Sequence, residues 1–208
     1  MKALLILLLI SFSTDTQDVI VLKHTTYTSH YSTSKHYPIY VEYVLTKEMV
    51  SCSPLKRFDD FKPDPLAFNQ TNTLNDYRGS GTDRGHMMSY QDNACQSQLV
   101  ANECFYMSNM SAQYHQLNAG DWEELEKEER KLVLIKGDLR IWAGNVGEIK
   151  KVGNVSVPKQ CWKVIYLKAT NTYQAYLFDN NTSQADGYAN NEVSLNKIIT
   201  LTNLTFKP

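Results

Sequence analysis

A histidine and a row of polar residues on one segment are the features of this sequence that could do chemistry. His86 ends the string Asp83-Arg84-Gly85-His86, and Asn118 further along opens a segment rich in acidic residues. Asn118, Glu126 and Arg130 are separated by multiples of four residues, so on a helix they share one face. A base, an amide oxygen, a carboxylate and a guanidinium together are the groups that hydrolysis of a phosphodiester requires.

These side chains are also compatible with a hard divalent cation. Mg²⁺ keeps most of its waters and accepts one or two protein oxygens. One Asn amide oxygen that binds Mg²⁺ directly, with a carboxylate that holds a metal-bound water, is therefore sufficient to bind the ion.

The positions of the arginines, and not the net charge of the chain, indicate an anionic ligand. The 21 basic and 22 acidic residues give a formal charge of −1, so the overall charge gives no indication of nucleic-acid binding. Four of the five arginines nevertheless lie in or beside the segments described above: Arg57, Arg78, Arg84 and Arg130. Because a guanidinium binds phosphate oxygens in pairs, this cluster supplies the local positive charge that the composition lacks.

At these residues the sequence resembles the DNA/RNA non-specific endonuclease family of the ββα-metal superfamily, which includes secreted bacterial nucleases and the mitochondrial endonuclease G type. The resemblance covers residues 41–206. It consists of the Asp-Arg-Gly-His box, the Ser108-Asn109 pair and a helix with the pattern Leu-Asn-x-Gly-x-Trp-x-x-Leu-Glu-x-x-x-Arg, in the family's order and spacing.

The resemblance implies a role for each matching residue. His86 would be the general base, and Mg²⁺, with Mn²⁺ as a substitute, would be held by Asn118 directly and by Glu126 through water. Asn109 would position the active-site loop. The residues that would contact or orient phosphate are Arg57, Arg84 and Arg130. The expected substrates are DNA and RNA, and the expected fold is an antiparallel α+β domain with a metal-site helix and a long active-site loop.

The hydrophobic pattern agrees with a mixed α+β domain. Alternating apolar and polar residues predict two or three strands over residues 18–50, and further strands over residues 103–108, 132–141, 161–169 and 173–178. The clearest helix spans residues 120–133, with acidic residues in its first turn and basic residues in its last. A second helix is expected over residues 193–199, and residues 51–80 form a long irregular stretch.

The start of the chain and its cysteines point to export. Residues 1–13 have the pattern of a signal peptide, which leaves residues 14–208 as a single nuclease domain in a secreted or periplasmic protein. No segment approaches the ~18 apolar residues that a membrane span needs. Four cysteines in an exported chain predict two disulfides; of the three possible pairings we favour Cys95 with Cys104 and Cys52 with Cys161.

Two alternatives of other classes remain open. The first is a catalytically silent domain of the same fold that binds nucleic acid, and a metal-dependent cleavage assay separates it from an enzyme. The second is an effector nuclease toxin delivered into other cells, which the signal-like start disfavours.

Overall fold

The structure is a computed structural model that describes residues 18–208. Its centre is a seven-stranded sheet in which all neighbouring strands are antiparallel. The strands lie in the order β1 (Val19–Lys23), β2 (Tyr27–Ser32), β3 (Tyr37–Leu45), β6 (Leu139–Val146), β9 (Gln160–Leu167), β10 (Thr172–Asp179) and β11 (Glu192–Val193). The expected antiparallel α+β architecture is confirmed. The predicted signal peptide, residues 1–13, lies outside the described residues.

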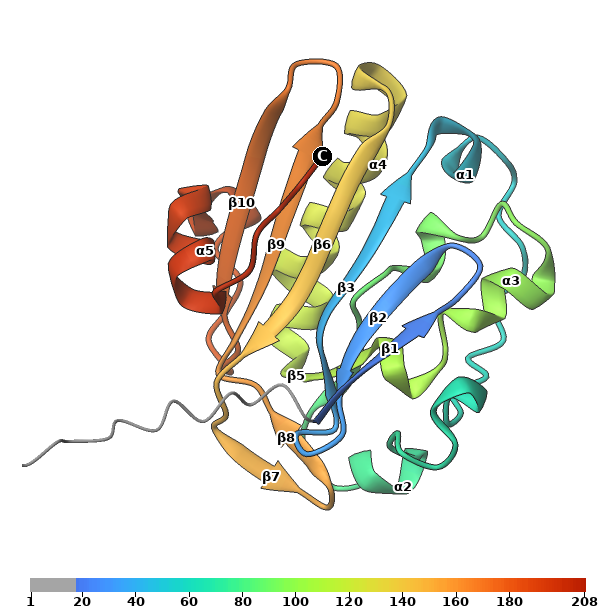
Figure 1. Ribbon diagram of the computed structural model, residues 1–208, viewed down its shortest axis with the longest axis vertical. Coiled ribbons are helices and arrows are strands. Elements are labelled where there is room, and N and C mark those ends of the chain that lie inside the picture. The colour runs from blue at the N-terminus through green and yellow to red at the C-terminus, as the bar shows by residue number, and fades with distance from the viewer. Residues whose placement is uncertain (1–17) are drawn as a thin grey trace, which may run out of the picture.

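Different elements cover the two faces of this sheet (Figure 1). The long helix α4 (Trp122–Lys136) packs on one face, where Leu125 and Val133 join the largest apolar cluster. The short helix α5 (Leu195–Thr202) and the C-terminal segment pack on the other, where Ile198 and Phe206 meet strand residues. Because side chains alternate along a strand, each central strand contributes to both clusters.

Two small two-stranded sheets and three short helices complete the fold. One sheet pairs β4 (Asp83–His86) with β5 (Met110–Gln113), and the other is a hairpin of β7 (Lys150–Val152) and β8 (Val155–Val157). The short helices are α1 (Lys47–Val50), α2 (Leu74–Tyr77) and α3 (Gln98–Glu103). Short 3₁₀ turns lie at Pro65–Ala67, Tyr90–Asp92, Met107–Asn109 and Tyr188–Asn191.

Two of the predicted strands are placed wrongly. Residues 98–103 form α3, because the Ser97 hydroxyl accepts a hydrogen bond from the Val100 amide and starts a helix; the strand that follows begins only at Met110. Residues 132–136 belong to α4, which ends where Gly137 takes a φ of 80°. The three N-terminal strands and the strands over residues 161–169 and 173–178 are confirmed.

The predicted disulfide pairing is also wrong. Cys52 is bonded to Cys95, whereas Cys104 and Cys161 are free and fully buried. Cys104 follows α3 and turns into the core, with its thiol near the Ser89 carbonyl. The intervening helix therefore directs Cys95 and Cys104 to different neighbours, although they are close in sequence. Among residues 18–208, no helix is long and apolar enough to cross a membrane.

Candidate active site

One pocket of about 240 Å³ brings together six of the seven residues predicted for the site. The six come from four separate stretches of the chain: the loop after α1, strand β4, the turn before α4, and α4 itself. The lining consists of Arg57, Arg84, His86, Ser89, Tyr90, Gln91, Asn118, Ala119, Glu123, Glu126 and Arg130. The seventh predicted residue, Asn109, is fully buried and does not line the pocket.

His86 is fixed by strand pairing and by an indole. It ends β4, where it lies opposite Met110 of β5, and its carbonyl accepts a hydrogen bond of 3.0 Å from Trp122 Nε1. The imidazole packs edge-on against Phe105, with 5.3 Å between ring centroids. The preceding residue, Gly85, has no room for a side chain, because a Cβ there would lie 1.8 Å from the Gln113 side-chain oxygen.

The surroundings of His86 keep its imidazole neutral. Burial, reinforced by the positive charges of Arg57 and Arg84 and opposed by Asp59, lowers the pKa of His86 to about 3. Its Nε2 is buried and has no hydrogen-bond partner within residues 18–208. Buried polar atoms normally have a partner, so an unpaired one beside a pocket is a functional candidate. A neutral imidazole can accept a proton.

Asn109 lies behind His86 and joins two chain segments. Its Oδ1 accepts a hydrogen bond from the Met88 amide, and its Nδ2 donates to the Met88 and Cys104 carbonyls, each at 2.9 Å. Its own carbonyl accepts a hydrogen bond from Met87. Asn109 thus holds the two residues that follow His86, as a positioning role requires.

Asn118 stands on a π-helical turn, Leu117–Asp121, rather than on α4. The turn is kinked at Gly120, whose φ and ψ of −112° and −116° are not helical. Asn118 Nδ2 donates to Asp83 Oδ2 over 3.0 Å. Since Asp83 takes the amide nitrogen, the amide oxygen is left for another partner. This oxygen and the Glu126 carboxylate fit the preference of Mg²⁺ for oxygen ligands and retained water.

Glu126 is a buried carboxylate at the pocket wall. It is 8% exposed, and burial raises its pKa, although the charges of Lys163 and Arg130 act in the opposite direction. Lys163 Nζ lies 4.0 Å from Glu126 Oε1. Trp122, one turn earlier on α4, is 1% exposed and belongs to the core.

Each predicted arginine is oriented by a partner. The Arg57 guanidinium lies 5.4 Å from the Phe105 ring centroid and that of Arg84 lies 4.5 Å from Phe61. Arg130 Nη1 is 2.8 Å from Asp92 Oδ1 instead of pairing with Glu126. Stacking and pairing hold guanidinium planes in place, so the arginines are pre-organised to donate to an anion.

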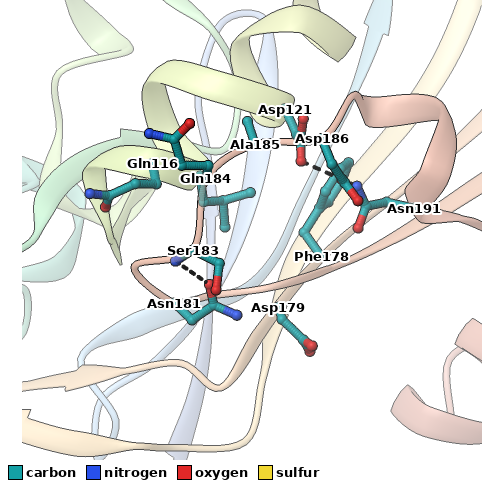
Figure 2. Close-up of a pocket in the computed structure, with 11 residues that line it drawn as sticks. Gln116, Asp121, Phe178, Asp179, Asn181, Ser183, Gln184, Ala185, Asp186 and Asn191 are labelled. Atoms are coloured by element: carbon teal, nitrogen blue, oxygen red, sulfur yellow. Dashed lines mark hydrogen bonds between the residues drawn. The ribbon is translucent and has the colours of Figure 1, made fainter.

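A second pocket, of about 180 Å³, borders the same π-helical turn (Figure 2). Figure 2 shows Asp121 directed toward the loop over residues 181–191, where it accepts a hydrogen bond of 3.3 Å from Asn191 Nδ2. Its other oxygen accepts one of 2.9 Å from the Gly187 amide. A Cβ at Gly120 would lie 2.6 Å from the Ala185 Cβ. The loop therefore braces the turn that carries Asn118.

The sequence did not identify every residue that the geometry brings to the site. Asp83 was quoted only as part of a motif, yet it orients Asn118. Ser89, Tyr90 and Glu123 line the pocket without a sequence signal. Lys163 has a signal that could have been used: it is the one charged residue of β9, and the residues on both sides of it, from Cys161 to Leu167, are apolar or aromatic.

The sequence model of the DNA/RNA non-specific endonuclease family matches residues 8–208 of this chain. The chain is 29% identical to a nuclease of Serratia marcescens over 200 residues, or 87% of this chain and 72% of that protein. It is 32% identical to the human mitochondrial nuclease EXOG over 162 residues, or 67% of this chain but only 42% of that protein.

A solved structure gives the same result for the fold. The EndoG chain in a complex of EndoG with EndoGI superposes with a TM-score of 0.79 at 27% identity, covering 89% of this chain and 84% of that one. The family match extends over nearly the whole chain, and the motif residues of β4, of the turn before α4 and of α4 line one pocket. The chain therefore belongs to the DNA/RNA non-specific endonuclease family.

Proposed function

We propose that this protein is a Mg²⁺-dependent, sugar-non-specific endonuclease that hydrolyses phosphodiester bonds of DNA and RNA. The observation that carries the proposal is the pocket in which a neutral buried histidine faces an amide, a carboxylate and three arginines. Relatives of the chain bear the names nuclease and endonuclease G, which fits this chemistry.

His86 is the proposed general base. Its neutral imidazole takes a proton from a water molecule as the water oxygen attacks phosphorus, and the bond from phosphorus to the leaving oxygen breaks. The hydrogen bonds from Trp122 to the His86 carbonyl and from Asn109 to the Met88 carbonyl hold the backbone on which the ring stands. A base that is already positioned and neutral requires no rearrangement before the reaction.

Arg57, Arg84 and Arg130 stabilise the negative charge that develops on the phosphate oxygens. Asn118 and, through water, Glu126 would hold Mg²⁺, which when bound supplies further positive charge at the phosphate. Asp83 orients Asn118 and thereby sets which atom of the amide faces the pocket.

The three arginines are suited to bind phosphate groups and not base edges. Phosphate contacts position a nucleic acid without carrying sequence information, and no base-reading helix accompanies them in the described residues. We therefore expect double-stranded DNA, single-stranded DNA and RNA to be cleaved at comparable rates.

We also propose that the protein works outside the cytoplasm, in the periplasm or after secretion. The support is the Cys52–Cys95 disulfide, since disulfides persist in oxidising compartments. The signal-like pattern of residues 1–13 agrees with this proposal.

Nicking of a supercoiled plasmid and degradation of an RNA of matched length test the proposed function. We expect EDTA to abolish both, and Mg²⁺ or Mn²⁺ to restore both. Asn118→Ala should be inactive at every metal concentration. The matched control is Asn154→Ala, because Asn154 also donates to an aspartate, Asp76, but at an exposed position.

Two results would contradict the proposal. Cleavage that persists in EDTA would exclude the metal-dependent mechanism. Retention of nucleic acid without any cleavage would favour the catalytically silent domain. Refusal of RNA, or a discrete cleavage ladder at one short DNA sequence, would remove the non-specific part of the proposal alone.

A further inference from the structure

Lys163 is a lysine with no exposed surface in the middle of β9. Its Nζ lies 3.1 Å from Glu129 Oε2, 4.0 Å from Glu126 Oε1 and 4.5 Å from the Trp122 ring centroid. Lysine is almost never fully buried unless it is paired, because desolvating an ammonium group is costly. The three contacts all lie on α4, the helix that forms one wall of the pocket.

We infer that Lys163 is a positioning residue for Glu126: its ammonium group fixes the Glu126 carboxylate at the wall of the pocket and so shapes the proposed metal site in the pocket that His86 also lines. This inference rests on the proposed function, because it assigns Lys163 to the same reaction.

The position of Glu126 on the helix explains how it shares this partner. Glu126 and Glu129 are three residues apart on α4, so both carboxylates lie on the side of the helix that meets Lys163. Lys163 lies within 4.0 Å of both, and it is the only cation at this distance from Glu126 in residues 18–208. Arg130, the other nearby cation, is committed to Asp92 at 2.8 Å.

A purely structural role would involve Glu129 alone. Lys163 and Glu129 form the closer pair, and both are fully buried. Replacing a buried ion pair by apolar residues of similar volume is often neutral for stability, whereas removing one partner is strongly destabilising. Removing both partners therefore separates the support that Lys163 gives to the fold from the support that it gives to Glu126.

The experiment compares the single variant Lys163→Met with the double variant Lys163→Met, Glu129→Leu. Melting temperature, kcat, KM for a labelled DNA duplex and the Mg²⁺ concentration for half-maximal activity are measured for each. Lys163→Arg tests rescue by a residue that keeps the charge. The matched control is Lys131→Met, since Lys131 is exposed and pairs with Glu128 on the outer side of the same helix.

We expect the single variant to lose both stability and activity. The double variant should regain the melting temperature, while its kcat stays about 10- to 100-fold below that of the wild type, the usual effect of losing a residue that orients a metal-site group. Its Mg²⁺ requirement should rise, and its KM for DNA should change little. Lys163→Arg should recover part of kcat, and Lys131→Met should match the wild type.

A double variant with wild-type kcat and a wild-type Mg²⁺ requirement would overturn the inference and leave Lys163 as a structural residue. The His86→Ala variant in the same assay keeps this outcome distinct from failure of the proposed function. Cleavage that is present in the wild type and lost in His86→Ala upholds the nuclease assignment whatever Lys163 does.

Discussion

The two faces of strand β9 differ in the side chains that they bury: one face buries apolar and aromatic groups, and the other also buries charge. Trp162, Val164 and Tyr166 point toward α5 and the C-terminal segment, whereas Cys161, Lys163 and Ile165 point toward α4. On the first face, the rings of Trp142 and Trp162 meet Phe206 at centroid distances of 5.4 and 5.6 Å. This face is held together by apolar burial and aromatic packing.

The α4 face contains buried charge. Asp92, Glu129 and Lys163 are each 0% exposed, and Glu126 is 8% exposed. Buried ion pairs contribute little to stability, because desolvation offsets most of the attraction between the charges. Charges retained on one face of a strand whose other face is apolar therefore indicate function on the α4 side and structural support on the α5 side.

The strongest test of this comparison is His86→Ala. Losing a positioned general base lowers activity by about 10²- to 10⁴-fold. We expect kcat on plasmid DNA to fall by this amount while DNA retention in a gel-shift assay is unchanged, since the arginines remain. Wild-type turnover in this variant would show that another group is the base.

Ile198→Ala on the α5 face should have the opposite effect to His86→Ala: a loss of stability without a loss of activity. Ile198 is fully buried against β9 and β10, so truncation should lower the free energy of unfolding by about 2–5 kcal/mol. We expect kcat, measured well below the melting temperature, to stay at the wild-type value. A large loss of kcat with an intact fold would mean that the two faces are coupled.

Much of the site could be predicted from the sequence, because its residues lie in short strings with fixed local geometry. Strand β4 places Arg84 and His86, and α4 places Glu126 and Arg130 at helical spacing. Export and metal dependence remain predictions. The local geometry failed at one point: Asn118 stands on a π-helical turn and not on the helix itself. Such a turn depends on the bracing loop over residues 181–191, which is distant in sequence.

Long-range partners were the part that the sequence could not supply. The partner of Cys52 is decided by how the loop before Arg57 lies on the segment after Tyr90, not by the number of intervening residues. Arg130 finds Asp92 rather than Glu126 for the same reason. The role of Lys163 is visible only in the folded protein, where β9 packs against α4 and brings Lys163 next to Glu126 and Glu129. Contacts of this kind follow from tertiary packing and have no local signature.

The disulfide gives a third prediction, on the pocket side of the sheet. It joins the loop that carries Arg57 to the segment that carries Tyr90, and the Leu55 amide also donates to the Ala94 carbonyl. Replacing Cys52 and Cys95 by serine should lower the free energy of unfolding by about 2–5 kcal/mol and reduce activity less than His86→Ala does. Thiol counting by mass spectrometry should find two free thiols in the native protein. Four free thiols would refute the bond.

The smallest expected effect concerns pH. Burial and the charges of Arg57 and Arg84 lower the pKa of His86, so its imidazole stays neutral at pH values where a free histidine, with a pKa of 6.5, is already protonated. Burial raises the pKa of Glu126, so as the pH falls Glu126 takes up a proton before His86 does.

Protonation of His86 should therefore not lower kcat between pH 7.5 and about 6.5, although an unperturbed histidine base would already be half protonated at pH 6.5. The profile is measured with saturating DNA at constant ionic strength, and Arg57→Gln serves as the comparison. Removing that positive charge favours protonation of His86, so any movement of the acid limb should be toward higher pH. A wild-type acid limb centred at or above pH 6.5 that moves in Arg57→Gln would show that His86 is protonated in this range despite its buried, positively charged surroundings.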